Sequence, residues 1–123
     1  MTVQQIESRE ATRKTASVAA SLISHYDTLL ADLDGVVYAG KQAIDGAVDS
    51  INRAVKAGLA VGYITNNSSR RPETIADQLN RFGLSVQPGD VISSGQTGVE
   101  LLATMIPAGA KVLVVGGEGL RKR

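Results

Sequence analysis

No cysteine occurs among the 123 residues of this sequence. Its absence excludes disulfide bonds, thiolate catalysis and cysteine-based zinc sites from this stretch of polypeptide. A sequence without cysteine is consistent with a reducing compartment, and we expect a cytoplasmic protein.

An excess of charge of one sign is also absent. Thirteen Lys and Arg residues stand against twelve Asp and Glu residues, which gives a formal net charge of +1. This balance gives no reason to expect a nucleic acid or an anionic membrane surface as a partner. No apolar run approaches the roughly 18 residues that a transmembrane helix needs. Residues 1–14 also lack the compact apolar stretch of a secretory signal. We therefore expect neither a nucleic-acid partner nor a membrane partner.

Hydrophobic residues make up 43% of the sequence and charged residues 20%, which is typical of a globular domain rather than a disordered chain. The length suits one domain. Residues 1–25 are polar and compatible with helix, so we expect a leader that ends in a short helix.

Short apolar segments alternate with segments of helical periodicity from residue 28 onward. This alternation indicates βαβ units, and therefore an α/β fold with a parallel sheet and right-handed crossovers. We expect strands at 28–33, 60–64, 91–93 and 111–115. We expect helices that begin near Asp45, Pro72 and Gln96 and that end at Gly58, Gly83 and Pro107.

Acidic side chains follow the first expected strand. Asp32 and Asp34 lie two positions apart, and Gly35 follows them. Two carboxylates this close repel each other, so either one binds a proton or a hard cation lies between them. Gly35 allows the main chain to turn with a positive φ, or to approach a ligand closely.

Uncharged polar side chains follow the second expected strand. Thr65 offers a hydroxyl group, the main chain of Asn66 offers an N–H group, and a helix begins nearby at Pro72. Such groups suit the binding of an anion. Ligands of parallel α/β sheets bind beyond the carboxyl ends of the strands. The two clusters together therefore indicate phosphoryl transfer, in which a metal ion offsets the repulsion between carboxylate and phosphate.

Two segments resemble the signature motifs of the haloacid dehalogenase-like hydrolases. Residues 32–38, Asp-Leu-Asp-Gly-Val-Val-Tyr, are similar to the first motif, and residues 64–70, Ile-Thr-Asn-Asn-Ser-Ser-Arg, are similar to the second. The resemblance covers roughly residues 22–123. Within it, Tyr38, the Asn66-Asn67 pair and residues 116–120 are similar to the capped branch of sugar-phosphatase-like proteins. That branch also includes 4-nitrophenyl, phosphoglycolate, glycerol-phosphate and pyridoxal phosphate phosphatases.

The resemblance implies a Mg2+-dependent phosphatase of small phosphorylated metabolites. Asp32 would attack the phosphorus and form an aspartyl-phosphate. Asp34 would protonate the leaving oxygen and then activate water. The Asp32 carboxylate and the Asp34 main-chain carbonyl would hold the metal ion, with waters and phosphate completing its coordination.

The resemblance also implies which residues would bind the substrate phosphate. Thr65 and Asn66 would contact the phosphoryl oxygens, and further contacts would come from the turn after the first strand. That turn comprises Leu33, Asp34 and Gly35. Residues 37–44 would form a small flap over the site.

The same family needs a lysine from a third motif and further acids from a fourth, and neither motif occurs before Arg123. We therefore expect an N-terminal fragment of a longer protein, and we do not expect the 123 residues alone to hold the complete catalytic set. The expected domains are a leader at 1–25, the N-terminal half of a Rossmann-like three-layer core at 26–108, and the beginning of an inserted α/β cap at 109–123. In such a fragment the strand at 28–33 would have an unpaired apolar edge.

Other functions stay open at this point. Asp32 could belong to a phosphate-accepting signalling module, or the chain could be an inactive fragment or binding subunit. Homo-oligomerisation is likewise open. A dinucleotide-binding loop at 117–119 is disfavoured because Lys122 occupies the position of the third glycine. His25, Tyr38 and Arg71 are expected to serve packing, capping or solvation, with a functional role for Arg70 left open.

Overall fold

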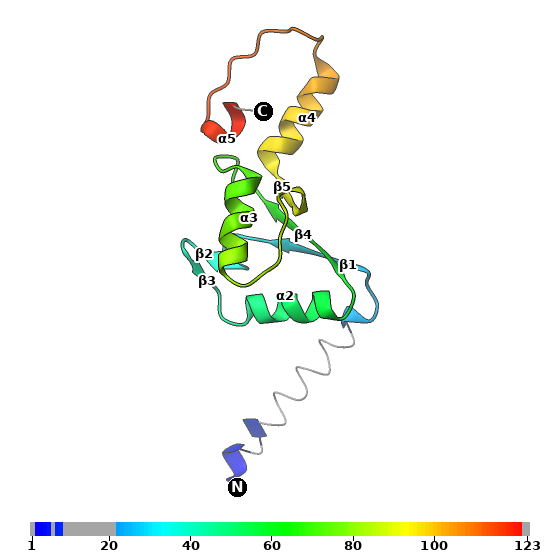
Figure 1. Ribbon diagram of the computed structural model, residues 1–123, viewed down its shortest axis with the longest axis vertical. Coiled ribbons are helices and arrows are strands. Elements are labelled where there is room, and N and C mark those ends of the chain that lie inside the picture. Colours follow the sequence, from blue (N-terminus) through cyan, green and yellow to red (C-terminus); the bar gives the residue numbers. More distant parts are fainter. Residues whose placement is uncertain (1, 6, 9–21, 122–123) are drawn as a thin grey trace.

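The computed structural model describes residues 2–5, 7–8 and 22–121. Strands β1 (Thr28–Asp32), β4 (Ala60–Thr65) and β5 (Val91–Ser93) form a parallel sheet in the order β1-β4-β5 (Figure 1). This confirms the expected α/β class and places three of the predicted strands to within a residue. The predicted leader helix lies largely outside the described residues.

Helices connect the parallel strands along one side of the sheet. Helix α2 (Ala47–Lys56) precedes β4, and helix α3 (Pro72–Arg81) with the 3-10 turn η1 (Pro88–Asp90) precedes β5. Glycines end both helices as expected, because Gly58 and Gly83 each have a φ of +100°, which few other residues adopt.

The strand register brings the carboxyl ends of the three strands to one edge of the sheet. Asp32 pairs with Ile64, and Thr65 pairs with Ser93. The residues that follow these positions therefore emerge side by side, where ligands of parallel α/β sheets bind.

One face of the sheet is covered and the other is open. Alternate residues such as Ala31, Tyr63 and Val91 are buried in a single core with Ile75 and Leu79 of α3, both of which have no exposed surface. The intervening residues point to the opposite face and include three large apolar side chains that are exposed: Leu30, Ile64 and Ile92. Of the three layers expected, the described residues supply two, a sheet and one layer of helices.

A short hairpin lies between β1 and α2, where the flap was expected. It comprises β2 (Tyr38–Ala39) and β3 (Gln42–Ala43), and helix α3 holds it in place. The buried side chain of Gln78 donates a hydrogen bond from Nε2 to the Gly40 carbonyl at 3.0 Å. The Tyr38 ring contacts the Phe82 ring with 6.2 Å between centroids.

The segment after β5 differs from the sequence-based expectation. Helix α4 (Ser94–Met105) begins two residues before the predicted Gln96, because Ser93 Oγ accepts a hydrogen bond from the Gln96 amide at 3.3 Å and caps the helix. The predicted strand at 111–115 is wrong. These residues are exposed and have no strand partner among the described residues, and a parallel strand needs one. Helix α5 (Glu118–Arg121) follows.

No helix in the described part of the chain is long and apolar enough to cross a bilayer. The expected cytoplasmic location stays a prediction.

Candidate active site

Asp32 occupies the last position of β1, and its carboxylate is exposed on the open face of the sheet. The main chain turns sharply after it. The Leu33 carbonyl accepts hydrogen bonds from the amides of Val36, Val37 and Tyr38 at 3.2, 2.9 and 3.2 Å. Gly35 has a φ of +80° in this turn, a conformation that glycine adopts without strain. The turn therefore carries Asp34 away from the strand while keeping it near the strand end.

Two main-chain amides that were expected to contact phosphate have partners in the structure. The Leu33 amide donates to Asp32 Oδ1 at 2.8 Å, and the Gly35 amide donates to the Tyr38 carbonyl at 2.8 Å. The first bond orients the Asp32 carboxylate. Phosphate contacts by Leu33 and Gly35 stay a prediction and would require these amides to exchange or share their partners.

The charges of both acids and of Arg70 act on the Tyr38 hydroxyl. Burial raises the pKa of this hydroxyl, while the positive charge of Arg70 and a hydrogen bond with its guanidinium lower it. The negative charges of Asp34 and Asp32 raise the same pKa further. Tyr38 therefore combines the expected packing role with an electrostatic coupling to Asp32, Asp34 and Arg70.

The polar loop after β4 is ordered by its own side chains. Thr65 is buried, and its Oγ1 accepts a hydrogen bond from the Asn67 amide at 3.1 Å. Asn67 Oδ1 in turn accepts bonds from the amide and the hydroxyl of Ser69 at 3.0 and 2.6 Å. Residues 65–69 thus form a turn held by hydrogen bonds among their own side chains and amides. It leaves the Thr65 hydroxyl proton available to a ligand, because the oxygen acts only as an acceptor in this bond.

A surface hollow of about 410 Å³ joins the ends of the three strands. It brings together three predicted site residues, Asp32, Thr65 and Asn66, with residues of β5 and α4 that the prediction did not include. Its full lining is Asp32, Ile64, Thr65, Asn66, Ile92, Ser93, Ser94 and Thr97. Leu33, Asp34 and Gly35 are not part of this lining. The sequence feature that could have indicated these additional residues of β5 and α4 is the run of hydroxyl side chains at the end of the third strand.

The comparisons with known proteins identify the family of the chain. The sequence model of the haloacid dehalogenase-like hydrolase family matches residues 29–123. The chain belongs to the haloacid dehalogenase-like hydrolases. The match includes both signature segments, at 32–38 and 64–70.

Similar proteins within this family are phosphatases by name. The chain is 39% identical over 100 residues to a D-glycerol 3-phosphate phosphatase of Mycobacterium tuberculosis, which covers 81% of this chain and 28% of that protein. It is 38% identical over 98 residues to an acid sugar phosphatase of Staphylococcus saprophyticus, which covers 80% of this chain and 38% of that protein. A crystal structure of a glycerol phosphate phosphatase from Mycobacterium tuberculosis in complex with magnesium has a TM-score of 0.73 and 37% identity, over 80% of this chain and 29% of that one. The chain thus spans well under half the length of these relatives.

The described part of this haloacid dehalogenase-like chain holds donors that suit a hard cation. Asp32 and Asp34 provide carboxylate and carbonyl oxygens, the ligand type that Mg2+ prefers, and both side chains are exposed. No group of three or more His, Cys, Asp or Glu residues that could hold a metal ion occurs among the described residues. Mg2+ commonly binds through one or two carboxylates and keeps several waters, so the donor set fits this ion without a full protein cage.

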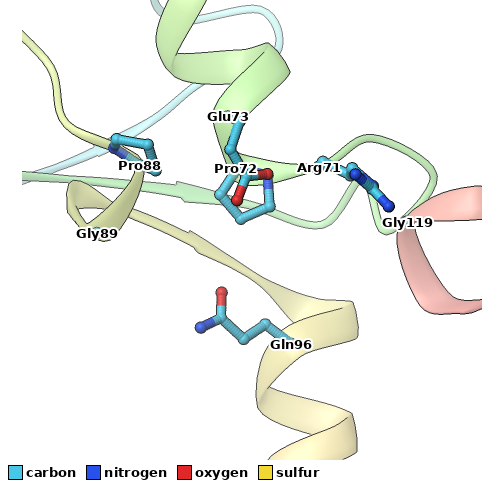
Figure 2. Close-up of a pocket in the computed structure, with 7 residues that line it drawn as sticks. All are labelled: Arg71, Pro72, Glu73, Pro88, Gly89, Gln96 and Gly119. Atoms are coloured by element: carbon cyan, nitrogen blue, oxygen red, sulfur yellow. The ribbon is translucent and has the colours of Figure 1, made fainter. Parts of the chain in front are cut away.

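A second hollow, of about 340 Å³, lies between the start of α3, η1 and the start of α4 (Figure 2). None of the predicted catalytic or phosphate-binding residues lines it. Gln96 extends toward it from α4, and its Oε1 is buried without a hydrogen-bond partner, while its Nε2 donates to Glu100 at 3.3 Å. Of the predicted site residues, Asp32, Thr65 and Asn66 line the first hollow, and none lines this one.

Proposed function

We propose that this chain supplies the nucleophile part of a Mg2+-dependent phosphatase that hydrolyses phosphate monoesters of small metabolites. One observation carries the proposal: Asp32, Thr65 and Asn66, from adjoining parallel strands, line the same hollow. The family assignment and the names of the relatives support it. Glycerol phosphate and sugar phosphates are the first esters to test, since the similar proteins carry these names.

The first half-reaction transfers the phosphoryl group to the protein. A carboxylate oxygen of Asp32 attacks the phosphorus, and the ester P–O bond breaks. Asp34 donates a proton to the leaving oxygen, so that the product departs as an alcohol. The Leu33 amide, which donates to Asp32 Oδ1 at 2.8 Å, holds the carboxylate in a defined orientation for this attack.

The second half-reaction releases phosphate and restores the site. Asp34, now a carboxylate, accepts a proton from a water molecule whose oxygen attacks the phosphorus of the aspartyl-phosphate. The bond between phosphorus and the Asp32 oxygen then breaks. Mg2+, held by the Asp32 carboxylate and the Asp34 main-chain carbonyl, would offset the negative charge between carboxylate and phosphate. The Thr65 hydroxyl and the Asn66 amide would bind the phosphoryl oxygens throughout.

Replacement of the nucleophile tests this function. In the intact protein, including any polypeptide beyond Arg123, Asp32→Asn should lower the turnover of 4-nitrophenyl phosphate by at least about 1000-fold, because the amide oxygen is a poor nucleophile. Asp77→Asn is the matched control, since Asp77 is an exposed acid on α3 away from the hollow. Parent turnover should require Mg2+. Substantial hydrolysis by Asp32→Asn would remove Asp32 from the nucleophile role, and stable phosphorylation without turnover would favour a signalling module.

A further inference from the structure

The start of helix α4 contacts the loop that follows β4. Ser94, the first residue of α4, donates a hydrogen bond from Oγ to the Asn66 carbonyl at 3.0 Å. Gly95 follows, and a Cβ atom at this position would lie 2.8 Å from Ser68 Cβ and 3.4 Å from Ser68 Cα. The absence of a side chain at Gly95 therefore permits the close approach that the Ser94 hydrogen bond requires.

One peptide group, between Asn66 and Asn67, links the hydrogen bond of Ser94 to the hydroxyl of Thr65. The Asn66 carbonyl and the Asn67 amide belong to the same planar unit, so fixing the oxygen also fixes the direction of the N–H bond. That N–H donates to Thr65 Oγ1 at 3.1 Å. Because this oxygen accepts the bond, the Thr65 hydroxyl proton is directed elsewhere, and Thr65 lines the hollow that contains Asp32.

We propose that Ser94 and Gly95 are positioning residues that hold the Asn66–Asn67 peptide, and through it the Thr65 hydroxyl, in the orientation that binds a phosphoryl group. This inference rests on the proposed function and extends it to α4. The hydrogen bonds within residues 65–69 fix the shape of the loop, whereas Ser94 fixes its position relative to the end of β5. Ser94 itself does not bind the phosphoryl group in this account.

Binding of inorganic phosphate to the intact protein in the presence of Mg2+ provides the first test. Ser94→Ala should raise the dissociation constant roughly tenfold, equivalent to about 1.4 kcal/mol. Ser94→Thr keeps the hydroxyl and should restore binding to within about threefold of the parent, equivalent to at most about 0.7 kcal/mol. Thr104→Ala is the matched control, since the Thr104 hydroxyl donates only to the Leu101 carbonyl of the same helix at 2.7 Å and lies outside the hollow.

The glycine provides a second and independent pair of variants. Gly95→Ala should weaken phosphate binding, because the new methyl group would push the Ser68 segment away from α4. Gly98→Ala is the control, since nothing lies within 4 Å of a Cβ built at that position. Equal phosphate affinity in the Gly95 and Gly98 variants would contradict the role of the close approach.

Amide hydrogen exchange separates this inference from the proposed function. In Ser94→Ala the Asn67 and Ser69 amides should exchange faster than in the parent, whereas in Thr104→Ala they should not. Unchanged exchange together with unchanged phosphate affinity would overturn the inference even in an active phosphatase. An inactive parent that binds phosphate in a Ser94-dependent manner would overturn the proposed function and leave the inference standing.

Discussion

Asp34 emerges from the sharp turn after β1, and its charge reaches the buried hydroxyl of Tyr38. If it is the general acid, its loss should matter most for esters whose alcohol is a poor leaving group, because these need protonation as the P–O bond breaks. Asp34→Asn should therefore lower kcat/KM for glycerol phosphate by at least about tenfold more than for 4-nitrophenyl phosphate. Steady-state kinetics with both substrates measure this ratio. A glycerol phosphate rate equal to that of the parent would show that Asp34 is not the acid.

Tyr63 makes the stability of the fold depend on pH in the alkaline range, independently of the candidate active site. Burial raises the pKa of its hydroxyl above the ordinary value of 10.0, and the charge of Asp90 raises it further. The unfolded chain therefore releases the Tyr63 proton at a lower pH than the folded chain does. The contribution of protonated Tyr63 to the unfolding free energy is complete below about pH 10 and is lost as pH rises through the folded pKa. In Tyr63→Phe the unfolding free energy should fall less steeply above pH 10 than in the parent. Parallel curves from denaturant titrations would contradict this assignment.

At the scale of single elements, local signals in the sequence located most of the fold. Pro72 and Gly83 bound a helix because their backbone preferences act within a few residues, and the strands predicted at 60–64 and 91–93 followed from their apolar composition. Residues 111–115 have the same apolar character and form no strand, because strand formation depends on a partner and not on local preference alone. The site shows the same limit. Asp32 and Thr65 were predicted from the expected strand ends and from motifs, whereas the Ser94 bond to Asn66 joins residues 28 apart and has no local signature.

The hairpin β2–β3 depends on helix α3 for its position, which a single side chain tests. Gln78 is buried and donates to the Gly40 carbonyl at 3.0 Å. Gln78→Met keeps the approximate volume but removes the donor, so we expect a loss of about 1 kcal/mol in unfolding free energy. Amides of residues 38–43 should exchange faster in this variant. Gln42→Met, at an exposed position of the hairpin itself, should change neither quantity, and an equal effect of both variants would show that the bond is not what anchors the hairpin.

For the molecule as a whole, the covered and open faces of the sheet differ sharply. Helices α2 and α3 pack on the face that carries Tyr63, while Leu30, Ile64 and Ile92 are exposed apolar side chains on the open face. Among the described residues, β1 pairs only with β4, so its other edge is unpaired. Unpaired strand edges and exposed apolar patches both promote association. The motifs predicted the unpaired edge, but the exposure of the whole face required the observed arrangement of helices.

Residues 1–123 in isolation should therefore self-associate or unfold without a single cooperative transition. Sedimentation velocity at micromolar concentrations measures the first outcome, and thermal unfolding followed by circular dichroism measures the second. Leu30→Lys and Ile92→Lys place charge on the open face and should shift the sedimentation profile toward monomer, because a lysine there disfavours strand and face pairing. Val55→Lys, at a similarly exposed apolar position on α2, should leave the profile unchanged. A parent fragment that is monomeric and unfolds in one cooperative step would show that the open face and edge are stable in water without a partner.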